Sequence, residues 1–363
     1  MSFIEKTRNW YGRFERPISS LSLILGFVFD AITLKRVDTL WEMTWIIAHL
    51  LVVGLFIILI HIQESEIGDE KNPSKRHFWY VNILQFFFGG ILSTYLVFYF
   101  RSSDIFSTWP FLLLLLIAFI ANESLKRHYI RLSFQISLFF ISIYSFMIFL
   151  VPVVLHKIGT YIFLISGFLS LIIILLFISV LFRFVKNKFI ENKKIILALI
   201  SIIFIVINFL YFTNLIPPIP LSLKDAGVYH SIQKKSDGNY SVTSENYSWR
   251  QYFKLYQDYK KTPESYVYAY SAVFSPKDLN LTIVHEWQHY NEIQKKWITE
   301  SVISLNVTGG RDGGFRTYSK RSNLEQGKWR VNVKTQFGQV IGKIRFNIIP
   351  VDVDPLLSIG TKN

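Results

Sequence analysis

The feature that most constrains this chain is a series of long apolar runs in its first 216 residues. A helix that crosses about 30 Å of hydrocarbon needs about 20 mostly apolar residues, and lipid leaves backbone groups no partner outside the segment itself. We therefore predict a membrane α-helical bundle of about seven transmembrane helices over residues 1–216. The runs lie near residues 17–34, 40–62, 79–100, 105–121, 134–155, 159–182 and 195–216.

The composition agrees with a membrane protein and excludes several other classes. The chain is 51% hydrophobic and only 18% charged, which is atypical of a water-soluble enzyme of this length. It has no Cys, so disulfide scaffolds, thiolate metal sites and cysteine nucleophiles are excluded. The net charge of +14 is shared evenly between the membrane part and the rest. We therefore expect the lipid bilayer as a partner, and no nucleic acid.

The distribution of basic residues predicts the orientation in the membrane. The N-terminal segment and the loops near residues 71–76, 126–131 and 183–194 carry fifteen Lys and Arg residues, whereas the opposite loops carry four. Positively charged loops resist translocation. We expect a multi-pass protein of the bacterial cytoplasmic (inner) membrane with a cytoplasmic N-terminus and an extracytoplasmic C-terminal domain.

Several polar residues lie at membrane depth, and they leave a transporter or a receptor as an alternative function. They are Asp30, Glu42, His49, Asn82, Gln85, Gln135 and Asn208. Such residues can mark a proton or substrate path, but Asn and Gln also commonly hold membrane helices together. The sequence shows no internal repeat of the transporter kind.

The pattern changes after the last apolar run, at Pro217-Pro-Ile-Pro220. We interpret residues 217–264 as a proline spacer and a partly helical linker, with a short amphipathic helix at 249–259. From 265 to 350, apolar and polar residues alternate in several short runs, and residues 351–363 form a tail. Alternation by two in short strands predicts a small antiparallel β-sandwich.

One strand-like run contains a zinc-protease pattern, His285-Glu286-Trp287-Gln288-His289. On a helix, His285 and His289 could hold zinc while Glu286 activates water, with Glu292 or Glu300 as a third ligand. On a strand, Glu286 points away from both histidines. The alternating residues around the pattern favour the strand, so a membrane-bound zinc-dependent hydrolase is kept as an alternative.

Other polar residues of this domain could form an aromatic floor with cationic rims, suited to a glycan or an anionic group. The candidates for ligand binding are His285, Trp287, Arg311, Asp312, Arg316, Tyr318 and Arg330. Trp287 and Trp329 can equally be core residues, and Asp312 can belong to a turn.

The segments 269–276, 285–290, 309–319, 327–333 and 338–342 together resemble the bacterial domain-of-unknown-function family 2914, over about residues 265–350. In that family the segment similar to 285–290 reads His-x-Trp without a requirement for Glu286 or His289, which implies a strand rather than a zinc site. The seven-span part followed by Ile-Pro-Pro-Ile-Pro is also similar to membrane-embedded members. The family brings no known activity.

These observations predict a membrane protein that presents an extracytoplasmic β-domain to an envelope ligand. The expected partners are an envelope glycan, an anionic ligand or another membrane protein. We expect no catalysis, no cofactor and no metal.

Overall fold

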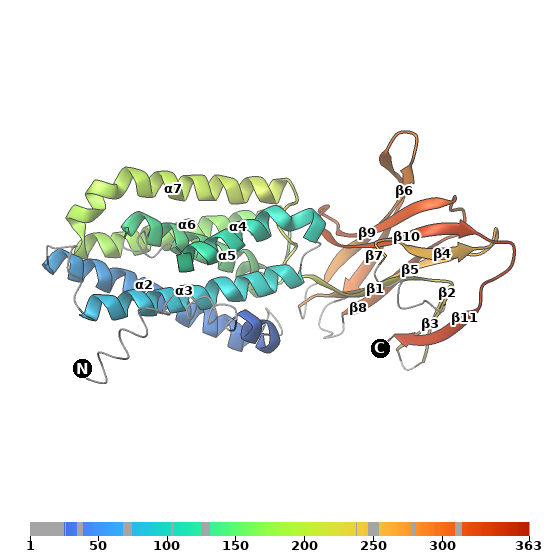
Figure 1. The fold of residues 1–363 in the computed structure, drawn as a ribbon, viewed down its shortest axis with the longest axis horizontal. Coiled ribbons are helices and arrows are strands. Elements are labelled where there is room, and N and C mark those ends of the chain that lie inside the picture. Colours follow the sequence, from blue (N-terminus) through green and yellow to red (C-terminus); the bar gives the residue numbers. More distant parts are fainter. Residues whose placement is uncertain are drawn as a thin grey trace, which may run out of the picture. The chain divides into compact units, whose positions relative to one another are not determined.

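The computed structural model describes residues 25, 27–34, 39–67, 75–102, 105–124, 131–236, 238–245, 254–276, 280–308 and 314–362. The chain forms a helical unit and a β-rich unit (Figure 1). The main division lies between Leu215 and Ile216, and the short segments 102–108 and 155–159 are grouped with the β-rich unit. Each unit has its own core, and the two are described separately.

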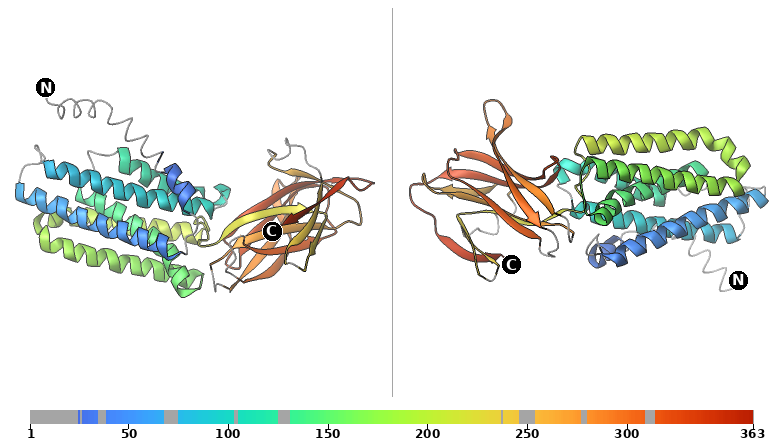
Figure 2. Two further views of the ribbon diagram at one scale, coloured as in Figure 1. Left: turned by 90° about the horizontal axis from the view of Figure 1, so that it is seen from below. Right: turned by 180° about the vertical axis from the view of Figure 1, so that it is seen from behind.

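The helical unit is a set of long apolar helices that run side by side (Figures 1 and 2). Residues 27–33 are also helical. The numbered helices are α2 (Leu40–Ile67), α3 (Lys75–Arg101), α4 (Ile105–Ser124), α5 (Leu132–Leu155), α6 (Thr160–Phe184) and α7 (Lys186–Phe212).

Five of these helices are long and apolar enough to cross a membrane: α2, α3, α5, α6 and α7. They coincide with five of the predicted runs. The run at 105–121 coincides with α4, whose apolar helical stretch, Thr108–Asn122, is shorter. The first predicted run lies partly outside the described residues.

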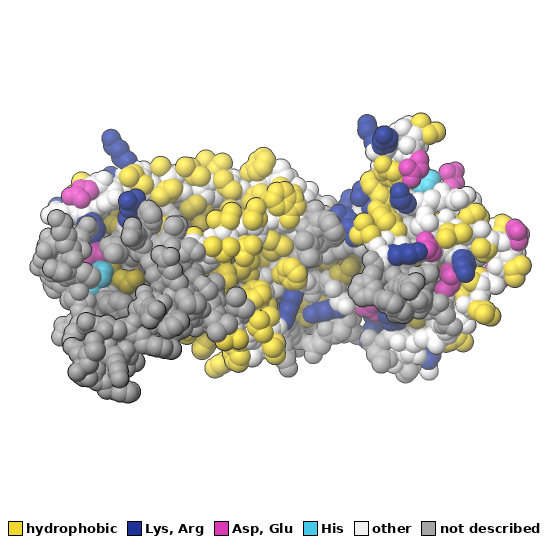
Figure 3. Space-filling view, viewed as in Figure 1, with side chains coloured by type: hydrophobic (Ala, Val, Ile, Leu, Met, Phe, Trp, Pro, Cys, Tyr) yellow, Lys and Arg dark blue, Asp and Glu magenta, His cyan; other side chains and the backbone are white. Residues whose placement is uncertain are grey.

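Apolar side chains lie across the described part of the face of the helical unit that Figure 3 shows, and others fill its interior. Large exposed ones include Leu176, Ile205 and Phe209, each more than 60% exposed. Apolar surface on this scale is unfavourable in water and favourable in contact with lipid. The outer surface therefore supports the membrane prediction independently of helix length.

Inside the unit, polar groups join helices to one another. The hydroxyls of Tyr95 and Tyr99 on α3 donate to the backbone carbonyls of Ser142 (2.8 Å) and Ser145 (2.9 Å) on α5. Bonds of this kind satisfy groups that lipid cannot.

Three of the polar residues predicted at membrane depth have the same role. Gln85 donates to Asn122 O (3.1 Å), Gln135 Oε1 lies 3.1 Å from His61 Nε2, and Asn208 donates to Tyr144 Oη (3.1 Å). His49 bonds through Nδ1 to the carbonyl of Trp45 in its own helix (2.9 Å).

The β-rich unit contains eleven numbered strands in three sheets among its described residues. The strands are β1 (Ser222–Tyr229), β2 (Ser231–Lys234), β3 (Tyr240–Glu245), β4 (Gln257–Lys261), β5 (Val267–Phe274), β6 (Asn280–Asn291), β7 (Lys296–Thr308), β8 (Phe315–Arg321), β9 (Gly327–Thr335), β10 (Val340–Pro350) and β11 (Leu357–Lys362). The strand orders are β4-β10-β9-β6-β7, β1-β5-β8 and β11-β3-β2. All pairs are antiparallel except β4 with β10.

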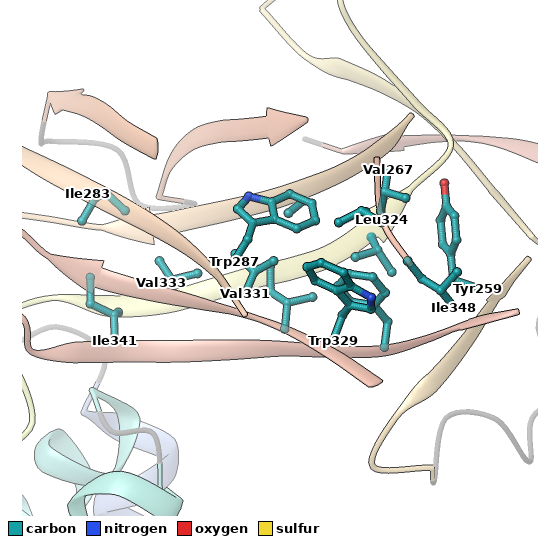
Figure 4. Packing of buried hydrophobic residues seen from close by; sticks show 14 of the residues in the cluster. Tyr259, Val267, Ile283, Trp287, Leu324, Trp329, Val331, Val333, Ile341 and Ile348 are labelled. Atoms are coloured by element: carbon teal, nitrogen blue, oxygen red, sulfur yellow. The ribbon is translucent and has the colours of Figure 1, made fainter. Parts of the chain in front are cut away.

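The main core joins the five-stranded sheet to the β1-β5-β8 sheet. Alternate residues of β6 and β9 point into it, including the fully buried Trp287 and the 2% exposed Trp329 (Figure 4). Val267, Ala269 and Val273 face them from β5. This alternation is what the sequence predicted for these segments.

The other face of β1-β5-β8 packs against the β11-β3-β2 sheet. Its small core contains Tyr229, Ile232, Val242, Tyr270 and Ala272. Because β1-β5-β8 is covered on both faces, the unit has three layers of sheet rather than two.

The segments interpreted as linker and tail contain strands instead. Strands β1 to β4 lie within 217–264, and β11 lies within 351–363. The helix predicted at 249–259 is wrong where it can be compared: residues 254–256 are not helical and β4 begins at Gln257, while 249–253 lie outside the described residues. The strand is favoured over the predicted helix because it buries Tyr259 fully against Phe346 and lets β4 pair with β10.

Replacing Trp329 should test the main core. Trp329→Ala removes a buried indole and its hydrogen bond to Glu325 O (2.8 Å), and should cost about 3 to 5 kcal/mol, a large share of ordinary domain stability. Thermal unfolding of the full chain, followed by near-ultraviolet circular dichroism, measures this. Ile293→Ala, at a side chain that is 94% exposed, is the matched control and should melt as the wild type does. Equal melting of the two variants would contradict the core assignment.

Candidate functional site

Strand β6 determines where the residues of the His-Glu-x-x-His pattern point. The strand prediction is confirmed, since residues 280–291 form β6 between β7 and β9. His285 and Trp287 therefore point into the main core, and Glu286 points to the opposite, outer face. Glu286 is held there by Lys334 Nζ (2.5 Å) and by Asn332 Nδ2 (2.7 Å). These two donors more than offset burial and keep the pKa of Glu286 below its usual value.

His285 is fully buried in a network of hydroxyl groups. Its Nε2 lies 2.8 Å from Ser271 Oγ, and its Nδ1 lies 2.8 Å from Ser319 Oγ. Ser319 also accepts a hydrogen bond from Trp287 Nε1 (3.0 Å). A neutral imidazole has one donor and one acceptor, and a hydroxyl can meet either. Burial lowers the pKa of His285 to about 4, so the ring is neutral at physiological pH.

The two histidines are too far apart for a shared zinc ion. Four residues along a strand span about 13 Å, whereas two nitrogens on one zinc each bond it at about 2 Å. His289 lies at the rim of the core, where its ring stacks on Trp329 (centroids 4.6 Å apart). Glu292 pairs with Lys328 (3.5 Å), and Glu300 is exposed. No cluster of three metal-ligating side chains occurs within the ranges that the structure describes.

Arg316 and Tyr318, two further predicted ligand residues, lie under the third sheet. They are on the face of β8 opposite to Ser319. Arg316 Nη1 donates to Gly238 O (3.1 Å) and to Asn239 Oδ1 (3.3 Å), which fastens the β2–β3 turn to β8. Tyr318 packs against the small core of that layer.

The predicted ligand residues that the structure describes therefore do not form one site. His285 and Trp287 point into the main core, whereas Tyr318 packs against the small core under the β11-β3-β2 sheet and Arg316 bonds to the β2–β3 turn beside it. Arg330 lies on the outer face of the five-stranded sheet, directly across from Gln288 and Arg345. Arg311 and Asp312 lie outside the described residues.

Arg330 is the member of this set that belongs to a cluster of aromatic and cationic side chains. Its guanidinium carbon lies 4.2 Å from the centre of the Trp297 ring. Tyr290, paired with Trp297 across the β6–β7 hairpin, has its ring 5.1 Å away. Tyr256 lies parallel to Trp297 at 6.4 Å. We call Tyr256, Tyr290, Trp297, Lys328, Arg330 and Arg345 the outer-face cluster.

Neighbouring side chains hold this cluster in place. Arg330 Nε donates to Gln288 Oε1 (2.7 Å), and the same oxygen accepts from Asn332 Nδ2 (3.0 Å). Lys328 Nζ lies 5.5 Å from the centre of the Tyr290 ring. A cation over an aromatic ring contributes about 0.5 to 2 kcal/mol, so these contacts orient the rings and the charges together.

The three aromatic rings of the cluster are half-buried, and Lys328 is exposed. Aromatic rings beside guanidinium and ammonium groups suit a sugar ring that carries a carboxylate or phosphate. Arg345, directly across from Arg330, adds a second guanidinium to the same face.

Sequence reasoning missed Tyr256, Tyr290, Trp297, Lys328 and Arg345 as candidates. A hairpin register that closes at Asn291 and Lys296 would have paired Tyr290 with Trp297. Alternation along β9 puts Lys328 and Arg330 on the face opposite to Trp329. Tyr256 carries no such signal, because it reaches Trp297 from a distant part of the chain.

Comparison with known proteins supports the predicted family resemblance of the C-terminal region and indicates no function. Residues 280–348 match the family described as "Protein of unknown function (DUF2914)", as the resemblance implied for the C-terminal region. The match does not extend to the helical unit. No curated protein matches the chain.

One solved structure shares a weak overall likeness. It is the Pseudomonas fluorescens alkylpurine DNA glycosylase AlkC bound to DNA containing an abasic site analog, at 8% identity and a TM-score of 0.22, covering 86% of this chain and 99% of that one. A TM-score this low supports no inference about fold or function.

Acid should destabilise the β-rich unit through His285. In an unfolded chain a histidine titrates near 6.5, whereas burial lowers the pKa of His285 to about 4. Between these two pH values the unfolded state binds more protons than the folded state. The contribution of neutral, buried His285 to the free energy of unfolding is therefore complete above pH 6.5 and is lost as the pH falls toward 4. The loss should be about 3 kcal/mol. Free energies of unfolding between pH 7.5 and 4 measure it.

Two glutamine variants separate this effect from general acid sensitivity. His285→Gln should flatten the stability profile between pH 6.5 and 4, whereas His289→Gln leaves the buried imidazole in place and should retain the wild-type slope. An unchanged slope in His285→Gln would show that the buried ring is not the source.

Proposed function

We propose that this chain is a multi-pass protein of the bacterial cytoplasmic membrane whose β-rich unit is an extracytoplasmic β-sandwich that binds an anionic glycan of the envelope. The helices anchor the protein, and the β-rich unit binds without catalysis. The observation that carries the ligand proposal is the outer-face cluster, in which the Arg330 guanidinium lies 4.2 Å from the centre of the Trp297 ring.

The membrane placement rests on helix length, surface and charge. Five helices are long and apolar enough to cross, and α6 and α7 each carry a series of exposed apolar side chains, among them Leu176 and Ile205. Exposed Trp41, Trp79, Trp109 and Tyr161 lie near helix ends, where aromatic residues favour the membrane interface. The excess of basic residues in alternate loops favours an external β-rich unit.

The ligand class follows from the chemistry of the outer-face cluster. The residues of this face and its edge are more often basic than acidic: Lys328, Arg330, Lys334, Lys343 and Arg345 outnumber Glu286, Asp258 and Glu292, of which Glu292 pairs with Lys328 (3.5 Å). Glu286 is already paired with Lys334, and Asp258 with Lys254 (2.7 Å). The excess positive charge beside aromatic rings favours an acidic polysaccharide over a neutral one.

Thiol labelling should establish the orientation. Asn323→Cys, at an exposed residue between β8 and β9, should react with a membrane-impermeant maleimide in intact spheroplasts. Asn187→Cys, exposed at the start of α7, should react only after permeabilisation. The contrast is clean because the chain has no other Cys. Labelling of Asn187→Cys alone in intact spheroplasts would reverse the proposed topology.

Binding to polysaccharides should test the ligand proposal. Full-length protein in detergent should bind polygalacturonate, which carries carboxylates, and should not bind neutral dextran. Trp297→Ala and Arg330→Gln should each weaken binding about 5- to 30-fold, the equivalent of about 1 to 2 kcal/mol. Biolayer interferometry at two salt concentrations measures both affinity and its electrostatic part.

The matched control is Lys320→Gln, at an exposed residue near the end of β8. It removes one positive charge from a different sheet and should leave affinity unchanged. A loss equal to that of Arg330→Gln would indicate general charge attraction instead of the outer-face cluster. Equal binding of dextran and polygalacturonate would exclude an acidic ligand.

A further inference from the structure

Basic side chains gather at the corner where α6 ends and α7 begins, next to long charge-free stretches of both helices. Residues 160–182 of α6 and residues 195–212 of α7 contain no charged residue. At 1.5 Å per residue these stretches measure about 34 Å and 27 Å, close to the hydrocarbon thickness of a bilayer. Charges begin only at Arg183 on α6 and end at Lys194 on α7.

Ring contacts fix how the two helices are aligned. Near one end, Phe163 stacks on Tyr211 with centroids 3.7 Å apart, and near the other Phe182 contacts Phe189 at 5.7 Å. The helices are therefore antiparallel, and Arg183 is level with the first turn of α7. Lys193 and Lys194 lie about 7 Å deeper, directly before the charge-free stretch.

The basic side chains at this corner point outward. Arg183, Lys186, Lys193 and Lys194 are exposed, and Lys186 Nζ lies 6.0 Å from the centre of the Phe182 ring. Lys188 is the exception, because it turns inward and pairs with Glu64 of α2. The inward pair fixes the start of α7 and leaves the four other cations on the outer surface.

The same band also exposes apolar side chains. Phe184 is 56% exposed and Ile190 is 54% exposed. The apolar groups lie at the hydrocarbon boundary, and the cations extend from that boundary, at Lys194, to about 12 Å beyond it, at Lys186. This range overlaps the headgroup layer of a bilayer, which is about 5 to 8 Å thick on each side. Long Lys and Arg side chains can reach the phosphate plane from either edge of that band.

We propose that the α6–α7 corner binds the phosphodiester headgroups of anionic phospholipids through Arg183, Lys186, Lys193 and Lys194. This inference rests on the membrane placement proposed above and is independent of the glycan ligand. Charge complementarity selects the occupant: of the residues at the corner only Glu191 is an exposed acid, so an anionic headgroup is favoured over a zwitterionic one. The bound lipid would fix α6 and α7 at this depth.

Lipid binding to the purified full chain tests the proposal. Phosphatidylglycerol or phosphatidylcholine is added to the protein in a neutral detergent, and the bound lipid is counted by native mass spectrometry. The thermal midpoint is measured in parallel. Phosphatidylglycerol should bind more tightly and raise the midpoint more than phosphatidylcholine. Lys194→Gln should weaken phosphatidylglycerol binding about fivefold, and the triple variant Arg183→Gln, Lys193→Gln, Lys194→Gln should remove the preference.

Lys157→Gln is the matched control, because it removes one exposed lysine from the connection between α5 and α6, at the opposite helix ends. It should retain the wild-type preference for phosphatidylglycerol. Equal binding of the two lipids by the wild type would overturn the proposal, as would an equal loss in Lys157→Gln and Lys194→Gln. Displacement of phosphatidylglycerol by millimolar inorganic phosphate would also overturn it, since the site would then bind free phosphate.

Alkaline carbonate extraction distinguishes failure of this inference from failure of the membrane placement. Release of the wild-type chain from membranes by carbonate would contradict the placement itself. Retention of the chain without a lipid preference would contradict only the headgroup site.

Discussion

The alternation of side chains along β6 is the constraint on which the β-rich unit depends. This strand pairs with β7 on one side and β9 on the other, so a one-residue slip would exchange its two faces. In the observed register, Trp287 and His285 fill the core between two sheets. Glu286 and Gln288 face outward and orient Asn332 and Arg330. One strand thus supports both the core and the outer-face cluster.

Burial of a histidine in that core is tolerated because its hydrogen bonds are made locally. Ser271 and Ser319 come from β5 and β8, the sheet that faces β6, and each offers a hydroxyl to one ring nitrogen. An unpartnered buried imidazole would cost a few kcal/mol. The two serines therefore make His285 compatible with an otherwise apolar core and fix how the two sheets face one another. The same arrangement separates His285 from Glu286, so the zinc-protease pattern has no metal-binding geometry.

The helical unit follows a different rule, because its outer surface is apolar. Several of its polar groups join one helix to another, as the hydroxyls of Tyr95 and Tyr99 do. Its charges are concentrated near helix ends, where Lys188 and Glu64 join α7 to α2. Separating apolar from charged surface in this way is compatible with a bilayer, and the proposed headgroup site uses the exposed cations of the α6–α7 corner.

The sequence by itself determined the long apolar helices, the presence of strands between residues 265 and 350, and the resemblance of the C-terminal region to the family that residues 280–348 match, because apolar runs and strict alternation are local properties of the chain. It determined that Glu286 and Trp287 lie on opposite faces for the same reason. Tertiary structure alone decided that β4 replaces a predicted helix, because the burial of Tyr259 beside Phe346 depends on a parallel pairing about 90 residues away in sequence. It also decided that Arg316 and Tyr318 lie beneath a third sheet built from short, polar strands that have little periodicity of their own. Above all, it brought Tyr256 to Trp297 and Arg330, since contacts between residues so distant in sequence arise only when separate strands pair and pack.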